Sequence, residues 1–225
     1  MLSNRTMSLY ASIVSDEPRL IFDHLPVFEQ YGMAGLHFDV MDGNFVPRLG
    51  LHPELLASIK EFSNLPIEAH LMLSKPEKYI EKFVDSGADR ILVHIESLVD
   101  PISTLELINS LGVESCVVLN PGTDFLNLES LLDRIESIML MAINPGIPRH
   151  SFIPSTLDKL KACRNWLDKS KPEVKIGIDG GVTFENAKQL YDSGADWLIC
   201  GSGTIFNSRG GLPDNILRLT DIFEK

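Results

Sequence analysis

The chain has 225 residues, 44% of them hydrophobic, which is enough for one large buried core and predicts a single domain over residues 1–225. Its 31 acidic and 20 basic residues give a net charge of −11, which argues against nucleic acid or a membrane surface as partner and requires any anionic ligand to be held by local groups. Three separated cysteines (Cys116, Cys163 and Cys200) indicate neither a disulfide framework nor a CxxC zinc site, and no apolar run resembles a signal or a membrane span, so we expect a cytoplasmic protein.

Short apolar runs alternate with longer amphipathic segments along the chain. We expect eight strands, at 8–14, 35–41, 66–73, 90–95, 114–120, 137–143, 174–179 and 197–203. Between them, apolar residues at three- to four-residue spacing predict helices at 17–32, 52–63, 75–87, 103–112, 155–170 and 183–194. Parallel strands need such helical crossovers, so the pattern indicates an α/β fold.

The junctions between these elements narrow the fold further. Gly32, Gly87, Gly112 and Gly194 stand where a helix should end and the next strand begin. The near-repeats SGADRILVHI and SGADWLICGS indicate a repeated strand–helix unit rather than a duplicated domain. Eight units predict a (β/α)8 TIM barrel, with an open doubly wound sheet as the alternative, and in a barrel the chemistry lies at the C-terminal ends of the strands.

Polar residues near the ends of apolar strands are therefore candidate site residues. His37 and Asp39 are two apart and share a strand face, while His70 and Asp179 occupy late positions in two other strands. Two imidazoles and two carboxylates match one divalent Zn, Fe or Mn ion better than a hard ion in an oxygen cage. The alternative is that each histidine caps a strand and each aspartate begins a turn.

Three other histidines have weaker claims to a site. His24 and His52 lie in or beside helices, where we expect surface or partly buried polar residues. His94 lies late in a strand, but Glu96 would be its same-face neighbour only if the strand continued that far. The role of His94 is left open.

The chain resembles the ribulose-phosphate 3-epimerase family over essentially its whole length. The resemblance rests on the order and spacing of SIVSDE, HFDVMDGNFVPRLG, AHLMLSKPEKYIEKFVDSGAD, LNPGT, NPG, IDGGVTFENAKQLYDSGAD and CGSGTIF. It implies a (β/α)8 isomerase of the pentose phosphate pathway that inverts C3 of a ketose phosphate, usually as a homo-oligomer. It also implies a divalent metal held by His37, Asp39, His70 and Asp179.

The family's chemistry gives two of these residues a second role. Removal of the C3 proton next to the C2 carbonyl leaves an enediolate, whose negative charge a metal would neutralise. The resemblance implies that Asp39 is the general base and Asp179 the general acid, with the roles exchanged in the reverse direction.

Further residues match family positions that surround the substrate. These are Ser12, Met41, His70, Met72, Met141, Gly146, Gly180, Gly181, Gly201 and Ser202. By resemblance, the methionines would shield the enediolate from water and the last four residues would hold the phosphate on backbone N–H groups. The structural alternatives are a serine bonded to backbone, methionines packed in the core and glycines required by tight turns.

The chain departs from the family in the loop after the sixth strand and in two smaller places. Pro-Gly-Phe-Gly-Gly-Gln is usual in that loop, whereas this chain has Ile147, Pro148, Arg149 and His150 after Pro-Gly. Pro148 removes an N–H donor and Arg149 restricts the backbone, although an arginine fork can itself bind phosphate. Ala11 replaces a proline and Arg48 an asparagine. Both arginines are either anion ligands or solvated surface charges.

The first expectation for the substrate pair is ribulose 5-phosphate and xylulose 5-phosphate. SFIPSTLDKL and GSGTIFN also look somewhat like allulose-6-phosphate 3-epimerases, which act on a six-carbon ketose phosphate. A barrel that binds a phosphosugar without turnover is an alternative from another class, and a metal-dependent aldolase or decarboxylase is a third. Related decarboxylases usually carry an Asp-x-Lys-x-x-Asp run, which is absent from this sequence.

Overall fold

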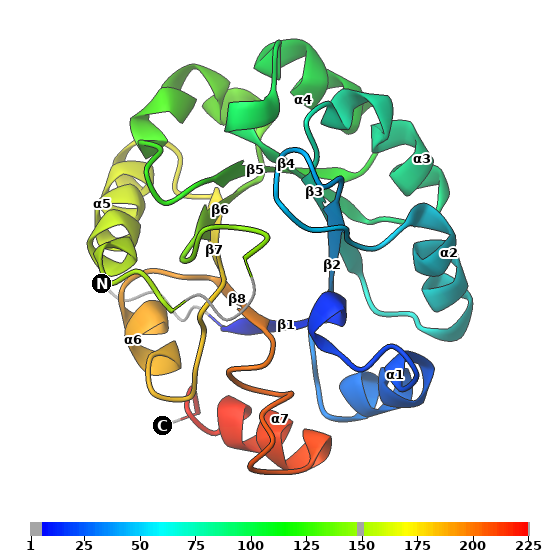
Figure 1. The fold of residues 1–225 in the computed structure, drawn as a ribbon. Helices are drawn as coiled ribbons and strands as arrows, with labels where there is room; N and C mark the ends of the chain where they lie inside the picture. Colours follow the sequence, from blue (N-terminus) through cyan, green and yellow to red (C-terminus); the bar gives the residue numbers. More distant parts are fainter. Residues whose placement is uncertain (1–5, 148–150, 225) are drawn as a thin grey trace.

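The computed structural model describes residues 6–147 and 151–224, in which eight parallel strands close into a barrel (Figure 1). The strands are β1 (Ser8–Ser12), β2 (Gly35–Met41), β3 (Ile67–Met72), β4 (Arg90–His94), β5 (Glu114–Leu119), β6 (Ser137–Met141), β7 (Lys175–Asp179) and β8 (Trp197–Cys200). They follow one another in sequence order, and β1 pairs with β8. The predicted (β/α)8 barrel is confirmed, because in an open doubly wound sheet the first and last strands, β1 and β8, would not pair with each other.

Helices cover the outside of the barrel (Figure 1). They are α1 (Ile21–Gln30), α2 (Pro53–Phe62), α3 (Ile80–Asp85), α4 (Pro101–Ser110), α5 (Ser155–Ser170), α6 (Ala187–Asp192) and α7 (Leu212–Thr220). Shorter 3-10 segments are η1 (Ile13–Ser15), η2 (Pro76–Lys78) and η3 (Ile95–Ser97), and a longer one, η4 (Phe125–Arg134), connects β5 to β6. Within the described residues, no helix is long and apolar enough to cross a membrane.

Helical segments beyond the six predicted from the sequence pattern lie in the crossover from β5 to β6 and after β8. In η4, Leu128, Leu131 and Leu132 are buried against the core. The amphipathic helix α7 follows β8. The predicted strand at 8–14 is also too long, because the chain turns into η1 after Ser12.

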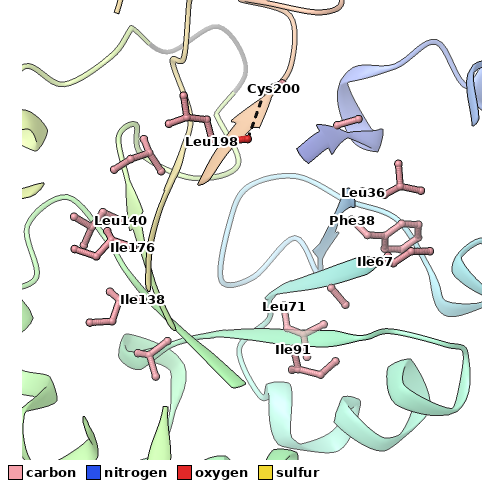
Figure 2. Close-up of a cluster of buried hydrophobic side chains, with 14 of the residues drawn as sticks. Leu36, Phe38, Ile67, Leu71, Ile91, Ile138, Leu140, Ile176, Leu198 and Cys200 are labelled. Carbon is pink, nitrogen blue, oxygen red and sulfur yellow. Dashed lines mark hydrogen bonds between the residues drawn. The ribbon is translucent and has the colours of Figure 1, made fainter. Parts of the chain in front are cut away.

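Side chains alternate across each strand between the helices and the barrel interior. Leu36 and Phe38 of β2 and Ile138 and Leu140 of β6 belong to the core outside the strand ring (Figure 2). A separate cluster fills the interior with Tyr10, Leu92, Cys116, Val118, Met139, Met141, Trp197 and Ile199. Because both faces are buried, the strands read as nearly continuous apolar runs, and a polar residue that points inward stands out.

The near-repeated SGAD motif joins a helix to the next strand at the N-terminal end of the barrel. A carboxylate oxygen of Asp89 accepts the N–H of Ile67 at 2.8 Å, and one of Asp196 accepts the N–H of Ile176 at 2.8 Å. The glycine of each motif has positive φ, as do Gly32 and Gly112. These contacts confirm a repeated strand–helix unit and tie each new strand to the preceding one.

The loop after β2, residues 42–50, folds back over the C-terminal mouth of the barrel. Asp42 fastens it, because its carboxylate accepts the N–H groups of Asn44, Phe45 and Ser74, each at 2.8 Å. The loop is therefore held to the start of the neighbouring loop after β3. This arrangement fixes Phe45 and Arg48 beside the ends of the strands.

Candidate metal and catalytic site

Four polar side chains meet at the C-terminal mouth of the barrel. His37 and Asp39 come from β2, His70 comes from β3, and Asp179 is the last residue of β7. Each offers one atom that can bind a metal, and these atoms all lie within 4.8 Å of one another. The fold thus brings together the four residues predicted as metal ligands.

The spacing of these atoms suits a single divalent ion. Nε2 of His37 lies 3.2 Å from Nδ1 of His70 and 3.2 Å from Oδ1 of Asp39. Oδ2 of Asp179 lies 3.8 Å from Nε2 of His37 and 3.6 Å from Nδ1 of His70. Ligand bonds of about 2.0–2.2 Å in a tetrahedral site place the ligand atoms roughly 3.3–3.6 Å apart. The donor set and its spacing therefore fit Zn²⁺, Fe²⁺ or Mn²⁺.

A buried carboxylate orients His37. Nδ1 of His37 lies 2.6 Å from Oε1 of Glu68, so this nitrogen donates and Nε2 is left to face the cluster. Glu68 is in turn fixed by Arg90, at 2.8 Å. Burial lowers the pKa of His37, but the negative charges of Asp39, Glu68 and Asp179 outweigh it and raise the pKa well above its usual value. The same excess of negative charge favours a metal cation at this position.

His70 is oriented by a second imidazole instead. Its Nε2 lies 2.9 Å from Nε2 of His94, whose Nδ1 lies 3.3 Å from Oε2 of Glu96. Strand β4 ends at His94, yet the carboxylate of Glu96 still reaches it from η3. Burial lowers the pKa of His94 to about 4, so its ring is neutral at pH 7. His94 therefore belongs to the support of the metal cluster.

His24 and His52 fall outside the cluster, as expected. His24 is partly buried and pairs with Asp16 at 2.8 Å, while the side chain of His52 is 66% exposed beside Glu54. Neither residue lines the cavity described next.

The two aspartates of the cluster have contrasting environments. Burial raises the pKa of Asp39, but the charge and hydrogen bond of His37 outweigh it and hold the pKa well below its usual value. Burial, reinforced by the charge of Asp39 and opposed by that of His37, raises the pKa of Asp179. Carboxyl groups whose pKa values are driven apart in this way suit one base and one acid.

A cavity of about 670 Å³ opens onto these carboxyl groups. Asp39 and Asp179 line it, whereas His37 and His70 are fully buried behind them. Nine other residues predicted to surround the substrate also line it: Ser12, Met41, Met72, Met141, Gly146, Gly180, Gly181, Gly201 and Ser202. The hydroxyl group of Ser12 donates to Oδ2 of Asp39 at 3.4 Å. Arg149 lies outside the described residues.

The sequence matches the model of the ribulose-phosphate 3 epimerase family over residues 8–206. The chain belongs to the ribulose-phosphate 3-epimerase family. It is an isomerase of the epimerase type. A ribulose-phosphate 3-epimerase of Aquifex aeolicus (strain VF5) is 41% identical over 201 residues, which cover 89% of this chain and 90% of the relative. One of Bacillus subtilis (strain 168) is 36% identical over 192 residues, or 85% of this chain and 88% of the relative.

Solved structures agree with the barrel fold of this epimerase-family chain. KGPDC from Streptococcus mutans has a TM-score of 0.71 and 14% identity, covering 96% of this chain and 97% of that one. The 3-hexulose-6-phosphate synthase of Salmonella typhimurium also has a TM-score of 0.71, with 15% identity over 97% and 99% of the two chains. At these identities the likeness shows the fold alone.

Among the described residues, the departures from the family that line the cavity are Arg48 and Ile147. Arg48 is exposed and lines the cavity from the loop after β2. Gly146, in the loop after β6, has φ +72°, and a Cβ there would overlap the side chain of Val46. The two loops therefore meet over the mouth, and this glycine is required by their close approach.

Sequence patterns alone leave Glu68, His94 and Glu96 without a role in the epimerase site. Glu68 can in principle be identified as a site residue from the sequence, because it is a charged residue in an apolar strand, two positions before His70 and on the same face. Glu96 cannot be identified in this way, since it lies beyond the end of β4, where the alternation of strand faces no longer applies.

Proposed function

We propose that this chain interconverts D-ribulose 5-phosphate and D-xylulose 5-phosphate in the pentose phosphate pathway, by metal-dependent proton transfer at C3. The observation that carries the proposal is the pair of carboxyl groups, Asp39 and Asp179, that line one cavity beside two buried imidazoles. The names of the curated relatives favour the five-carbon substrate pair.

In this proposal, His37, Asp39, His70 and Asp179 hold one divalent ion. His37 contributes Nε2 and His70 contributes Nδ1, the nitrogens that face each other at 3.2 Å. The bound ion supplies positive charge that offsets the negative charge of the enediolate. The side chains around the cluster keep both rings in position and the anionic cluster out of bulk water.

Proton transfer is assigned to the two aspartates. Oδ1 of Asp39 faces the imidazoles, while Oδ2 faces Ser12 and is the oxygen we assign to remove the C3 proton of ribulose 5-phosphate. Asp179, whose pKa is raised, carries the proton that is delivered to the other face of C3. In the reverse reaction the two residues exchange roles.

The cavity walls complete the proposed site. Met41, Met72 and Met141 are nearly fully buried and present apolar surface that keeps water from the enediolate. We assign the phosphate to the loops after β7 and β8, at Gly180, Gly181, Gly201 and Ser202, where barrels commonly bind phosphate. Tight turns account for part of this pattern, because Gly180 and Gly181 have positive φ and Gly201 does not.

The cellular setting is part of the same proposal. We assign residues 1–225 to a single catalytic domain in the cytoplasm, where reducing conditions suit three free, buried cysteines. We also propose a homo-oligomer. Phe22 and Phe62 support it, since they pack at 5.4 Å on the outside of α1 and α2 and remain 41% and 69% exposed.

Solvent exchange at C3 tests the proposed activity. Metal-loaded protein is incubated in D₂O with ribulose 5-phosphate or allulose 6-phosphate, and NMR follows deuterium at C3 and the appearance of the epimer. We expect exchange and inversion with a higher kcat/KM for ribulose 5-phosphate. A preference for allulose 6-phosphate would overturn the substrate, binding without exchange would indicate a non-catalytic barrel, and carbon–carbon cleavage would indicate a lyase.

A further inference from the structure

The two histidines of the metal cluster present different ring nitrogens to it. His37 uses Nε2, and its other nitrogen faces the carboxylate of Glu68. His70 uses Nδ1, and its other nitrogen faces a second imidazole, that of His94, at 2.9 Å. A neutral imidazole carries one proton, so the direction of this contact decides whether Nδ1 of His70 keeps a free lone pair.

The rings of His70 and His94 meet edge to edge. Their planes differ by only 16° and their centroids are 5.0 Å apart, while the facing Nε2 atoms are 2.9 Å apart. In this orientation an N–H of one ring points along the ring plane at the lone pair of the other. His94 is fully buried, and Phe45 packs against its ring with centroids 4.8 Å apart. The packing leaves the contact little freedom to rearrange.

Glu96 sets the direction of the proton. Its Oε1 accepts the N–H of Asn120 at 2.8 Å and the hydroxyl of Thr123 at 2.5 Å, and its Oε2 faces Nδ1 of His94. Burial raises the pKa of Glu96, but these hydrogen bonds outweigh it and hold the pKa at about 2. An ionised carboxylate only accepts, so Nδ1 of His94 must donate to it. With the imidazole proton of His94 on Nδ1, its Nε2 is the acceptor in the 2.9 Å contact between the two rings, and Nε2 of His70 donates.

We propose that Glu96 and His94 are positioning residues that hold His70 in the tautomer protonated at Nε2, leaving Nδ1 free to bind the metal. In the competing tautomer, Nδ1 of His70 donates to Oδ1 of Asp39, which lies 3.3 Å away, and its lone pair is lost. Glu96 and His94, together called the relay below, select against that tautomer. The inference rests on the proposed function only for the presence of a metal at the cluster.

Two substitutions reverse or remove the relay. In Glu96→Gln, Asn120 and Thr123 both donate to one side and select the amide oxygen there, which turns the amide N–H₂ toward His94. Nδ1 of His94 then accepts, its Nε2 donates to His70, and His70 takes its proton on Nδ1. His94→Phe keeps an aromatic ring but removes the acceptor. His24→Phe is the matched control, because His24 pairs with Asp16 away from the cavity.

The first readout is the tautomer in metal-free protein. Long-range ¹H–¹⁵N correlation spectra at pH 7 report which nitrogen of each histidine is protonated, and loss of signals in His70→Gln assigns His70. We expect an Nε2-protonated His70 in the wild type and in His24→Phe, and an Nδ1-protonated His70 in Glu96→Gln and His94→Phe. An Nδ1-protonated His70 in the wild type would overturn the inference.

The second readout is the affinity for Zn²⁺, measured by competition with a chromophoric chelator. We expect about 10- to 100-fold weaker binding in Glu96→Gln and His94→Phe, the usual cost of losing a group that orients a metal ligand, and no change in His24→Phe. Affinities of both relay variants within twofold of the wild type would also overturn the inference. If His94→Phe fails to fold, Glu96→Gln, which preserves side-chain volume, carries the test.

The two proposals fail separately. Neither readout requires substrate, so an absence of epimerisation beside the expected tautomer and affinity changes contradicts the proposed activity alone. Epimerisation by a wild type whose His70 is protonated at Nδ1 contradicts the relay alone.

Discussion

Asp39 and Asp179 carry the same chemical group in different surroundings. The imidazole of His37 lies against Asp39 and lowers its pKa, while burial and a neighbouring negative charge raise the pKa of Asp179. The difference arises because Nε2 of His37 lies 3.2 Å from a carboxylate oxygen of Asp39 but 3.8 Å from the nearest one of Asp179. A pair of identical side chains can therefore serve as base and acid without any change of residue type.

Arg48 is the charged residue by which the described part of this site departs from its family. It is exposed, lines the cavity and has no ion-pair partner among the described residues. We predict that Arg48→Ala raises KM for the sugar phosphate roughly 2- to 10-fold with kcat unchanged, because an exposed charge contributes modest, uniform binding. Steady-state kinetics measure it.

Arg19→Ala is the control for this substitution. Arg19 is 76% exposed and pairs with Glu17, and it does not line the cavity, so its removal changes net charge without touching the site. An unchanged KM in Arg48→Ala, or an equal rise in both variants, would show that Arg48 is a solvated surface charge and not a ligand of the sugar phosphate.

The loops after β2 and β6, rather than the strands, carry the differences between this cavity and that of the family. The loop after β2 is fastened by three N–H groups that Asp42 accepts, and it carries Val46 to within contact of Gly146. The strands below it supply His37, Asp39, His70 and Asp179, the residues of the proposed metal and proton-transfer site. Changes in the loops therefore alter substrate recognition before they alter the reaction.

Substitution of Asp42 tests whether the loop after β2 acts on substrate binding rather than on the reaction. We predict that Asp42→Ala lowers the free energy of unfolding by about 1–2 kcal/mol, because three N–H groups lose their acceptor, and raises KM more than it lowers kcat. Urea denaturation and steady-state kinetics measure the two effects. Asp42→Asn keeps one carbonyl oxygen and should fall between; a larger effect on kcat than on KM would show that the loop acts on the chemistry itself.

The elements also show what the sequence can and cannot predict. Eight strands and the sharing of one face by His37 and Asp39 follow from apolar runs and a period of two. A 3-10 helix at η4 does not follow, because its buried residues Leu128, Leu131 and Leu132 are spaced as they would be in an α-helix. The contact between Glu96 and His94 does not follow either, since it depends on the turn that the chain makes into η3.

The closed barrel places Asp39 and Asp179, the two proposed proton-transfer groups, around one cavity. In the closed barrel, β2 and β7 are separated by β1 and β8, so Asp39 and Asp179 approach the cavity from different strands and not from neighbouring ones. Inversion needs a base on one face of C3 and an acid on the other, which a single strand cannot supply. Closure of the barrel is therefore what makes an epimerase possible from these residues.

Exchange at C3 in two variants tests this account most directly. With metal at saturation in D₂O, Asp39→Asn and Asp179→Asn should each lose epimer formation by about 10²- to 10⁴-fold, the usual contribution of a general acid or base. Asp179→Asn should still place deuterium at C3 of ribulose 5-phosphate without inverting it, and Asp39→Asn should do so only for xylulose 5-phosphate. Epimerisation at the wild-type rate by either variant, or the same exchange pattern in both, would contradict the assignment of one aspartate to each face.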